Sequence, residues 1–117
     1  MDTMEVMYRC VSGLDVHKQI VVACRRRLLE GGQVEKEVQT FGTTTSSLLA
    51  LLEWLREWRV THVAMESTGV YWKPIWNILE GHMELLLVNA RHLKTVPGRK
   101  TDVKDCEWIA QLMQYGC

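Results

Sequence analysis

The sequence has no apolar run long enough to cross a membrane and no N-terminal export signal. Its longest apolar runs, Leu48–Leu52 and Leu85–Val88, are far shorter than the ~20 residues of a membrane-spanning helix. The first residues, Met1–Arg9, include Asp2 and Glu5 and show no basic segment followed by an apolar one. We therefore expect a cytoplasmic chain without a membrane segment.

Cysteines are few, and none belongs to a recognisable metal-binding pair. There is no C-x-x-C motif, and the histidines lack the i, i+4 spacing of a helical metal site. Cys10, Cys24 and Cys106 each lie in an apolar periodic segment, so we expect buried, reduced thiols. The pattern argues against a structural zinc site.

The chain also lacks net charge, which argues against a general nucleic-acid coat protein. Its basic residues are nevertheless unevenly distributed. One group lies near the start (His17, Lys18, Arg25–Arg27) and one near the end (Arg91, His92, Lys94, Arg99, Lys100, Lys104). Such groups are often solvated faces, but their position beside the acids described below favours contact with a phosphate backbone.

The first third of the chain has the pattern of a three-stranded antiparallel meander. We expect strands at residues 8–15, 19–29 and 34–41, since the second run is rich in β-branched residues and the third alternates apolar with polar ones. Gly31 and Gly32 accept the positive φ of a tight hairpin turn. A length of 117 residues is consistent with one domain, residues 1–117.

Helices and strands alternate in the remainder. Thr43–Ser46 offers N-caps for a helix whose leucines share one face, and Thr61–Glu66 reads as a short strand. Pro74 places the start of the next helix near Tyr71 or Trp72. A buried strand is expected at residues 83–88, a basic loop at 89–100, and a last helix capped by Thr101 and running to about residue 115. The order βββαβαβα predicts an α/β fold with a mixed five-stranded sheet and flanking helices.

Four acids stand where such a fold places ligands. Asp15 and Glu66 end strands that we expect to be parallel neighbours, and Asp102 and Asp105 are expected in the first turn of the last helix, on one face. Each has a simpler explanation, since an acid can end a strand or stabilise a helix N-terminus. Converging carboxylates repel one another unless a cation neutralises them, and Mg²⁺ or Mn²⁺ prefers such oxygen ligands.

Four segments together carry a family resemblance: Gly13–Lys18, Met65–Trp72, Val88–Lys94 and Pro97–Asp105. They resemble the N-terminal domain of the DEDD transposases, the insertion-sequence family that includes the Piv-type invertases and the bridge-RNA-guided recombinases. The resemblance implies an RNase H-like, RuvC-like fold. It also implies that Asp15, Glu66, Asp102 and Asp105 are catalytic residues that bind Mg²⁺ or Mn²⁺ for phosphodiester cleavage and strand transfer in DNA transposition.

The resemblance sharpens the interpretation of neighbouring residues. We expect contacts with nucleic acid, either DNA or a guide RNA, from residues around the acids: His17, Lys18, Thr68, Tyr71, Arg91, Arg99, Lys100 and Lys104. Tyr71 could either pack or stack on a base or sugar, whereas Trp72 has core spacing. Trp54, Trp58, Trp76 and Trp108 are assigned to the core or to a subunit interface, because the family resemblance implies multimers.

Two other functions compete with a recombinase domain. Proteins of this family continue into a second, serine-bearing domain that this sequence lacks, so one alternative is a truncated, non-catalytic module that binds nucleic acid and multimerises. The other is a phosphotransferase of the actin and sugar-kinase type. That fold needs small residues after the first-strand Asp so that backbone amides can approach phosphates, but His17 and Lys18 occupy the turn.

Overall fold

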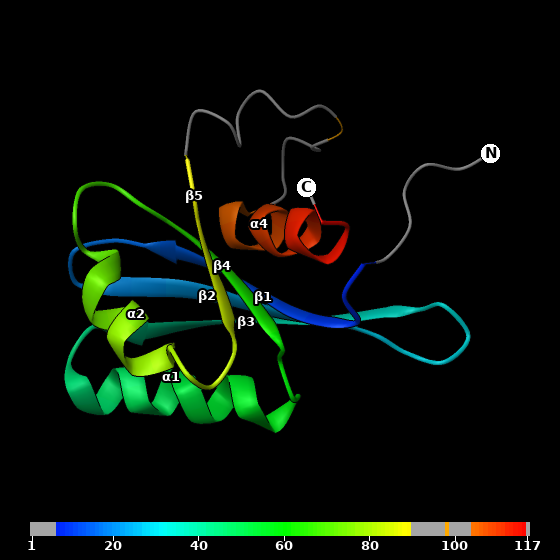
Figure 1. The fold of residues 1–117 in the computed structure, drawn as a ribbon, viewed down its shortest axis with the longest axis horizontal. Helices are drawn as coiled ribbons and strands as arrows, with labels where there is room; N and C mark the ends of the chain where they lie inside the picture. The colour runs from blue at the N-terminus through cyan, green and yellow to red at the C-terminus, as the bar shows by residue number, and fades with distance from the viewer. Residues whose placement is uncertain (1–6, 90–97, 99–103, 117) are drawn as a thin grey trace.

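The computed structural model describes residues 7–89, 98 and 104–116 and contains one mixed sheet with helices on both faces. In chain order the elements are β1 (Cys10–Val16), β2 (Ile20–Leu28), β3 (Val34–Gly42), α1 (Thr45–Glu57), β4 (His62–Ser67), α2 (Trp72–Leu79), β5 (Glu84–Val88) and α4 (Asp105–Gln114). The strand order is β3-β2-β1-β4-β5 (Figure 1). The predicted α/β architecture and element order are confirmed.

The pairing directions follow from the connections. β1, β2 and β3 form an antiparallel meander, and Gly31 and Gly32 adopt φ of 91° and 89° in the β2–β3 turn. β4 pairs in parallel with β1, and β5 pairs in parallel with β4. Both pairs are parallel because a helix precedes each of these strands and carries the chain back across the sheet. β1 is therefore the central strand, with one antiparallel and one parallel neighbour.

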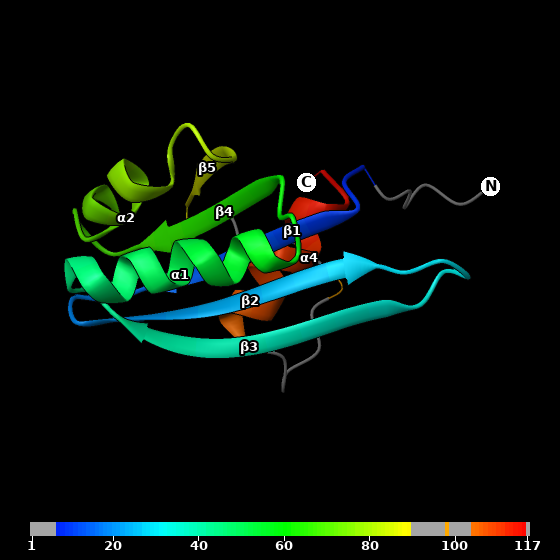
Figure 2. The same cartoon turned by 90° about the horizontal axis from the view of Figure 1, so that it is seen from below.

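One face of the sheet is covered by α1 and α2. The predicted leucine face of α1 (Leu48, Leu51, Leu52 and Leu55) packs against strand residues that include Leu14 and Met65. The Thr44 side chain caps α1 by accepting a hydrogen bond from the backbone N–H of Ser47, as its position predicts. Figure 2 shows α1 in front of the sheet on this side, running roughly along the direction of β2.

Among the described elements, α4 covers the other face. Its residues Trp108, Ile109 and Ala110 pack with the sheet residues Val11 and Ala64 in a second core cluster. Figure 2 shows α4 behind the strands, opposite α1. Successive residues of β1 point to opposite faces of the sheet. Leu14 and Val16 face α1, whereas Val11, Gly13 and Asp15 face α4.

At Gly13 the backbone of α4 comes very close to the sheet. A β-carbon at this position would lie 2.3 Å from the Cys106 carbonyl oxygen and 2.4 Å from the Ala110 backbone nitrogen. A glycine inside a strand often marks such an approach of another backbone. The absence of a side chain at Gly13 therefore lets α4 rest directly on the backbone of β1.

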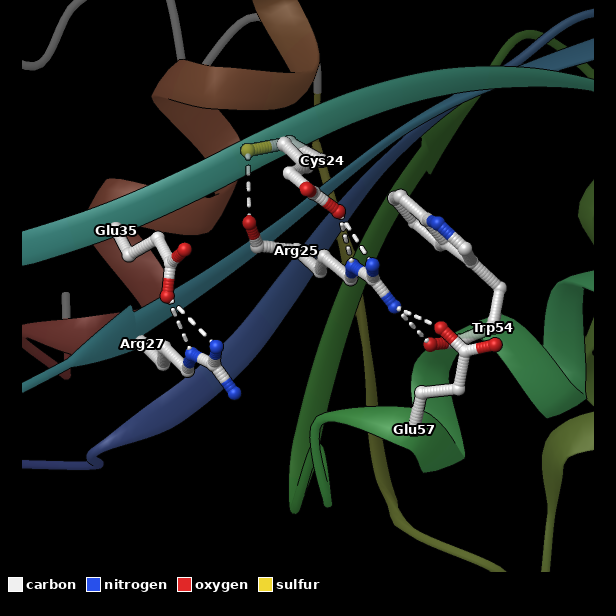
Figure 3. A network of polar contacts seen from close by, with 7 residues as sticks. Cys24, Arg25, Arg27, Glu35, Trp54 and Glu57 are labelled. Carbon is white, nitrogen blue, oxygen red and sulfur yellow. Dashed lines mark hydrogen bonds and ion pairs between the residues drawn. The ribbon is translucent and has the colours of Figure 1, made fainter.

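Arg25 is the most buried charged side chain of the described residues, with 7 % of its surface exposed. Its guanidinium lies between the rings of Trp54 and Trp58, 4.5 Å and 4.3 Å from their centroids. It donates to the Trp54 carbonyl at 2.7 Å and forms ion pairs with Glu37 and Glu57 (Figure 3). Burial lowers the pKa of Arg25, but the hydrogen bonds to the two carboxylates outweigh it and the net shift is upward.

This network corrects the interpretation of Arg25–Arg27 as a phosphate-binding segment. Arg27 pairs with Glu35 and stacks on Trp58, and Arg26 donates to the side chain of Gln114. The segment also lies toward the amino end of β1, because Arg25 pairs in register with Ser12. That is three residues, or roughly 10 Å of strand, from Asp15. These arginines therefore bind the sheet to neighbouring helices, Arg25 to α1 and Arg26 to α4.

Two further predictions are wrong in detail. The strand predicted to be buried at residues 83–88 is the sheet edge β5, where Leu86 and Leu87 are 43 % and 41 % exposed, because no described strand covers its outer side. The last helix also starts later than predicted: α4 begins at Asp105, and its N-cap is Lys104 in an extended conformation. Thr101 and Asp102 lie outside the described residues.

The tryptophans occupy the places predicted for core residues. Trp108, on α4, is buried in the second core cluster, and Trp54, Trp58, Trp72 and Trp76 pack against the first core cluster while keeping part of their surface exposed. Over the described ranges, no helix is long and apolar enough to span a bilayer.

Candidate functional site

Asp15 and Glu66 lie side by side at the carboxyl ends of the two central parallel strands. They are register partners in the β1–β4 pair, and Val88 of β5 continues the same row. Register partners project to the same face of a sheet, here the face covered by α4. Both carboxylates are partly buried. The prediction that these two acids lie side by side is confirmed, because they are partners in the β1–β4 register.

The Asp15 carboxylate is bound by the first residue after β1. The Nε2 atom of His17 lies 3.1 Å from Oδ2 of Asp15, and the Asp15 side chain is only 16 % exposed, against 51 % for His17. The sequence suggested His17 as a phosphate contact and missed this pairing. An i, i+2 spacing at a strand end was the available signal, because such residues project to one side.

α4 begins at the same edge of the sheet. Its later residues lie at the amino end of β1, where the Gln114 carbonyl accepts from the backbone N–H groups of Met7 and Tyr8. With Cys106 and Ala110 over Gly13, the helix runs antiparallel to β1, and its first residue Asp105 lies toward the Asp15 end. Gly13 therefore fixes how close this helix start comes to the strand acids, a role that the sequence did not reveal.

The donor set is chemically suited to a hard divalent cation, because it consists of carboxylate oxygens. The structure describes three of the four predicted ligands, Asp15, Glu66 and Asp105; Asp102 lies outside the described residues. Within the described ranges, no three acid, histidine or cysteine side chains are gathered closely enough to hold a metal ion. The fold thus brings two acids into register and directs a third toward them.

The predicted nucleic-acid contacts that are described lie at this edge. Lys18 is exposed in the turn after β1, Thr68 is exposed after β4, Tyr71 is the N-cap of α2 with 39 % of its surface exposed, and Lys104 is the exposed N-cap of α4. Arg91, Arg99 and Lys100 lie outside the described residues. The described part of the predicted interface therefore surrounds the strand acids.

A shallow pocket opens at the ends of β4 and β5, next to Glu66. It has a volume of about 380 Å³ and is lined by Ser67, Gly69, Trp72, Leu87, Val88 and Asn89. The lining combines a hydroxyl, an amide and an aromatic ring. Such a lining can accept a group that is partly apolar and partly polar, such as a sugar or a base.

The buried thiols are not reactive groups of this site. Burial raises the pKa of Cys24 to about 12 and the pKa values of Cys10 and Cys106 to about 11, in each case mainly by desolvation of the thiolate. Cys24 and Cys106 are buried and Cys10 is partly exposed, all three as free thiols. The prediction of buried, free thiols is confirmed for Cys24 and Cys106, whereas Cys10 is free but only partly buried.

The raised pKa values predict a loss of stability in alkaline solution. Below pH 9 the thiols are protonated in both states, but between pH 9 and 12 the unfolded chain loses the Cys24 proton first, which favours unfolding. We expect the free energy of unfolding, measured with urea, to fall between pH 8 and pH 10. The fall should be smaller in Cys24→Ala than in the parent by roughly 1 kcal/mol. Equal declines in the two proteins would contradict burial of this thiol.

Comparison with protein families gives a match that covers nearly the whole chain. The sequence model of the DEDD_Tnp_IS110 family, described as a transposase, matches residues 12–116. None of the curated proteins matches the chain. The matched range includes all four predicted acids.

Comparison with solved structures supports the predicted fold. The structure of RuvC from Thermus thermophilus is similar with a TM-score of 0.61 and 12 % identity, over 87 % of this chain and 91 % of that one. The same protein in complex with a Holliday junction substrate has a TM-score of 0.57 and 12 % identity, over 87 % of this chain and 90 % of that one. The Fowlpox virus resolvase in complex with Holliday junction DNA has a TM-score of 0.50 and 12 % identity, over 79 % of this chain and 65 % of that one. At this identity the similarity shows a RuvC-like fold.

Proposed function

The chain belongs to the DEDD_Tnp_IS110 transposase family, and on this basis we propose that it is the catalytic domain of a DNA transposase that cleaves and transfers phosphodiester strands. Asp15, Glu66, Asp102 and Asp105 bind Mg²⁺ or Mn²⁺ in this proposal. The observation that carries it is the register of Asp15 with Glu66 at the carboxyl end of the parallel strands, where α/β sheets place their ligands.

A bound divalent cation supplies Lewis-acid stabilisation of the negative charge that develops on a phosphate during cleavage. The residues of the chain hold that cation and orient the DNA. The Nε2 atom of His17 lies 3.1 Å from Oδ2 of Asp15, a position from which the imidazole would orient the carboxylate and leave its other oxygen available as a ligand. Gly13 allows α4 to approach the strand so that Asp105 is directed to the same edge.

DNA is the proposed substrate, and two of the similar structures contain Holliday junction DNA. Lys18 and Lys104 are exposed on either side of the acids and would neutralise phosphates of the backbone. Tyr71 would stack on a base or sugar at the start of α2. A guide RNA is proposed as a second ligand of the same basic residues, which would read its backbone in the same way.

A nicking assay tests the proposal. Supercoiled and branched DNA are incubated with the chain and Mn²⁺, and the fraction of nicked product is measured for the parent, for Asp15→Asn and for Glu66→Gln. We expect metal-dependent nicking by the parent and its loss in both variants. The matched control is Glu30→Gln, an exposed acid in the β2–β3 turn at the other end of the sheet, which should nick normally.

Two results would overturn the catalytic proposal. Nicking that persists in Asp15→Asn would place the activity elsewhere. Metal-independent DNA or RNA binding without any nicking would instead support the non-catalytic module, in which the same surface only holds nucleic acid.

A further inference from the structure

The close contact at Gly13 does not by itself fix where α4 lies along the sheet. Gly13 has no side chain, and a helix that rests on such a position can still slide along β1 or turn about its own axis. Asp105 is the first residue of α4. Sliding or rotation of the helix would therefore move this acid relative to the strand acids, Asp15 and Glu66.

Two polar side chains on one side of α4 are bound by the sheet. Glu107, in the first turn, accepts from Nζ of Lys36 at 2.6 Å, and its side chain is only 16 % exposed. Gln114, the last residue of the helix, accepts from Nε of Arg26 at 2.6 Å. Glu107 and Gln114 are two helical turns apart, hence on the same side and roughly 10 Å apart along the axis. The two contacts therefore hold both ends of α4.

The two basic residues start from the same place on the sheet. Arg26 of β2 and Lys36 of β3 are partners in the β2–β3 register, on the face that α4 covers. From there the Arg26 side chain reaches the end of the helix, whereas the Lys36 side chain reaches its start. Because the two contacts diverge, a shift of α4 in either direction along its axis lengthens one of them. We call the contacts Lys36–Glu107 and Arg26–Gln114 the α4 clamp.

Gln114 is the fully buried member of the α4 clamp, with 0 % of its surface exposed. Its Nε2 atom donates to the Arg9 carbonyl at 3.3 Å, and its backbone carbonyl accepts from the N–H groups of Met7 and Tyr8 at 2.8 Å and 3.1 Å. A buried amide is costly unless its polar atoms are paired. Any other position of the helix end would break these bonds, so they select one position.

We propose that Lys36 and Gln114 are positioning residues of the acid site. The α4 clamp holds the helix at one place along the sheet and thereby keeps Asp105 at the edge where the strand acids lie. Both residues act through the helix and touch neither cation nor DNA. The inference rests on the proposed function, because it concerns a cation only if the acids bind one.

Lys36→Met tests the α4 clamp at its exposed end, since the Lys36 side chain is 49 % exposed and its replacement leaves the core intact. Removing a positive charge would by itself favour a bound cation and tighten Mn²⁺ binding. Loss of positioning should instead raise the Mn²⁺ dissociation constant, by about tenfold. Calorimetric titration therefore separates the two effects by their sign. Lys36→Arg keeps the charge and the donor, and it should restore binding close to that of the parent.

Hydrogen exchange of the Trp108 amide gives a second readout that needs no metal. This amide donates to the Lys104 carbonyl at 3.0 Å in the first turn of α4. In Lys36→Met it should exchange about tenfold faster, because the first turn opens more readily. The Leu48 amide, which donates to the Thr44 carbonyl at 2.9 Å at the start of α1, should exchange at the parent rate.

Arg56→Met is the matched control. It removes a comparably exposed cation from α1, where Arg56 is 55 % exposed and pairs with Glu53 of the same helix. It should bind Mn²⁺ and exchange like the parent. The proposal is overturned if Lys36→Met binds Mn²⁺ as tightly as the parent or more tightly, or if its Trp108 amide exchanges at the parent rate. If the parent binds no Mn²⁺, the cation site fails instead, and the exchange rates alone decide whether the clamp holds α4.

Discussion

Gly13→Ala is expected to weaken both the fold and the acid site. The added methyl group would lie 2.3 Å from the Cys106 carbonyl oxygen and 2.4 Å from the Ala110 nitrogen, and these backbone atoms cannot rotate away as a side chain could. α4 must therefore move off β1, which disturbs the cluster formed by residues such as Trp108 and Ile109. We expect a loss of roughly 3 kcal/mol in the free energy of unfolding, measured by urea denaturation.

Gly42→Ala is the matched control for this change. A β-carbon at Gly42 would lie 3.2 Å from the Ser47 hydroxyl oxygen, which belongs to a side chain that can rotate, so the expected loss is below ~1 kcal/mol. The folded fraction of Gly13→Ala should also bind Mn²⁺ more weakly than Gly42→Ala. Equal stability of the two variants would show that the close approach of α4 to β1 is not a constraint on the fold.

Arg25→Lys is expected to be nearly as disruptive although it conserves the charge. The ion pairs themselves contribute little, because the side chains of Glu37 and Glu57 are 50 % and 64 % exposed. The larger loss comes from two interactions that an ammonium group cannot reproduce. These are the stacking of the planar guanidinium between Trp54 and Trp58 and its hydrogen bond to the Trp54 carbonyl. Together these predict a loss of roughly 2–4 kcal/mol in the free energy of unfolding.

Arg27→Lys tests whether burial is the cause. Arg27 also stacks on Trp58 and pairs with a carboxylate, but its side chain is 36 % exposed, so its replacement should cost less than ~1 kcal/mol. Thermal and urea unfolding of the two variants give the comparison. Similar losses at both positions would show that burial of Arg25 does not determine the cost, because both changes conserve the charge.

The secondary structure and the strand pairing could be predicted from the sequence, because strands, turns and helix caps each have local sequence patterns. Gly31 and Gly32 marked the hairpin, Pro74 marked the start of α2, and the leucine spacing marked the buried face of α1. The parallel pairing of β1 with β4 followed from the helical connection between them. Asp15 and Glu66 were therefore placed together correctly.

Features that depend on distant partners were not predictable in this way. Arg25 resembled a phosphate ligand because its partners Glu37, Trp54 and Glu57 come from two other elements. β5 was expected to be buried because its sequence is apolar, but it is an edge strand on which Leu86 and Leu87 are exposed. The start of α4 was misplaced because Thr101 is a good cap, whereas Lys104 has no side-chain capping bond.

A calorimetric titration of the 117-residue chain with Mn²⁺ tests the cation site most directly, with the parent compared with Asp15→Asn and Glu66→Gln. We predict saturable binding by the parent and a large loss in each variant, while Glu30→Gln binds like the parent. Because neutralising the acids also removes their mutual repulsion, both variants should remain folded. Parent-like Mn²⁺ binding by Asp15→Asn, or no saturable binding by the parent, would contradict the assignment of a cation site to these acids.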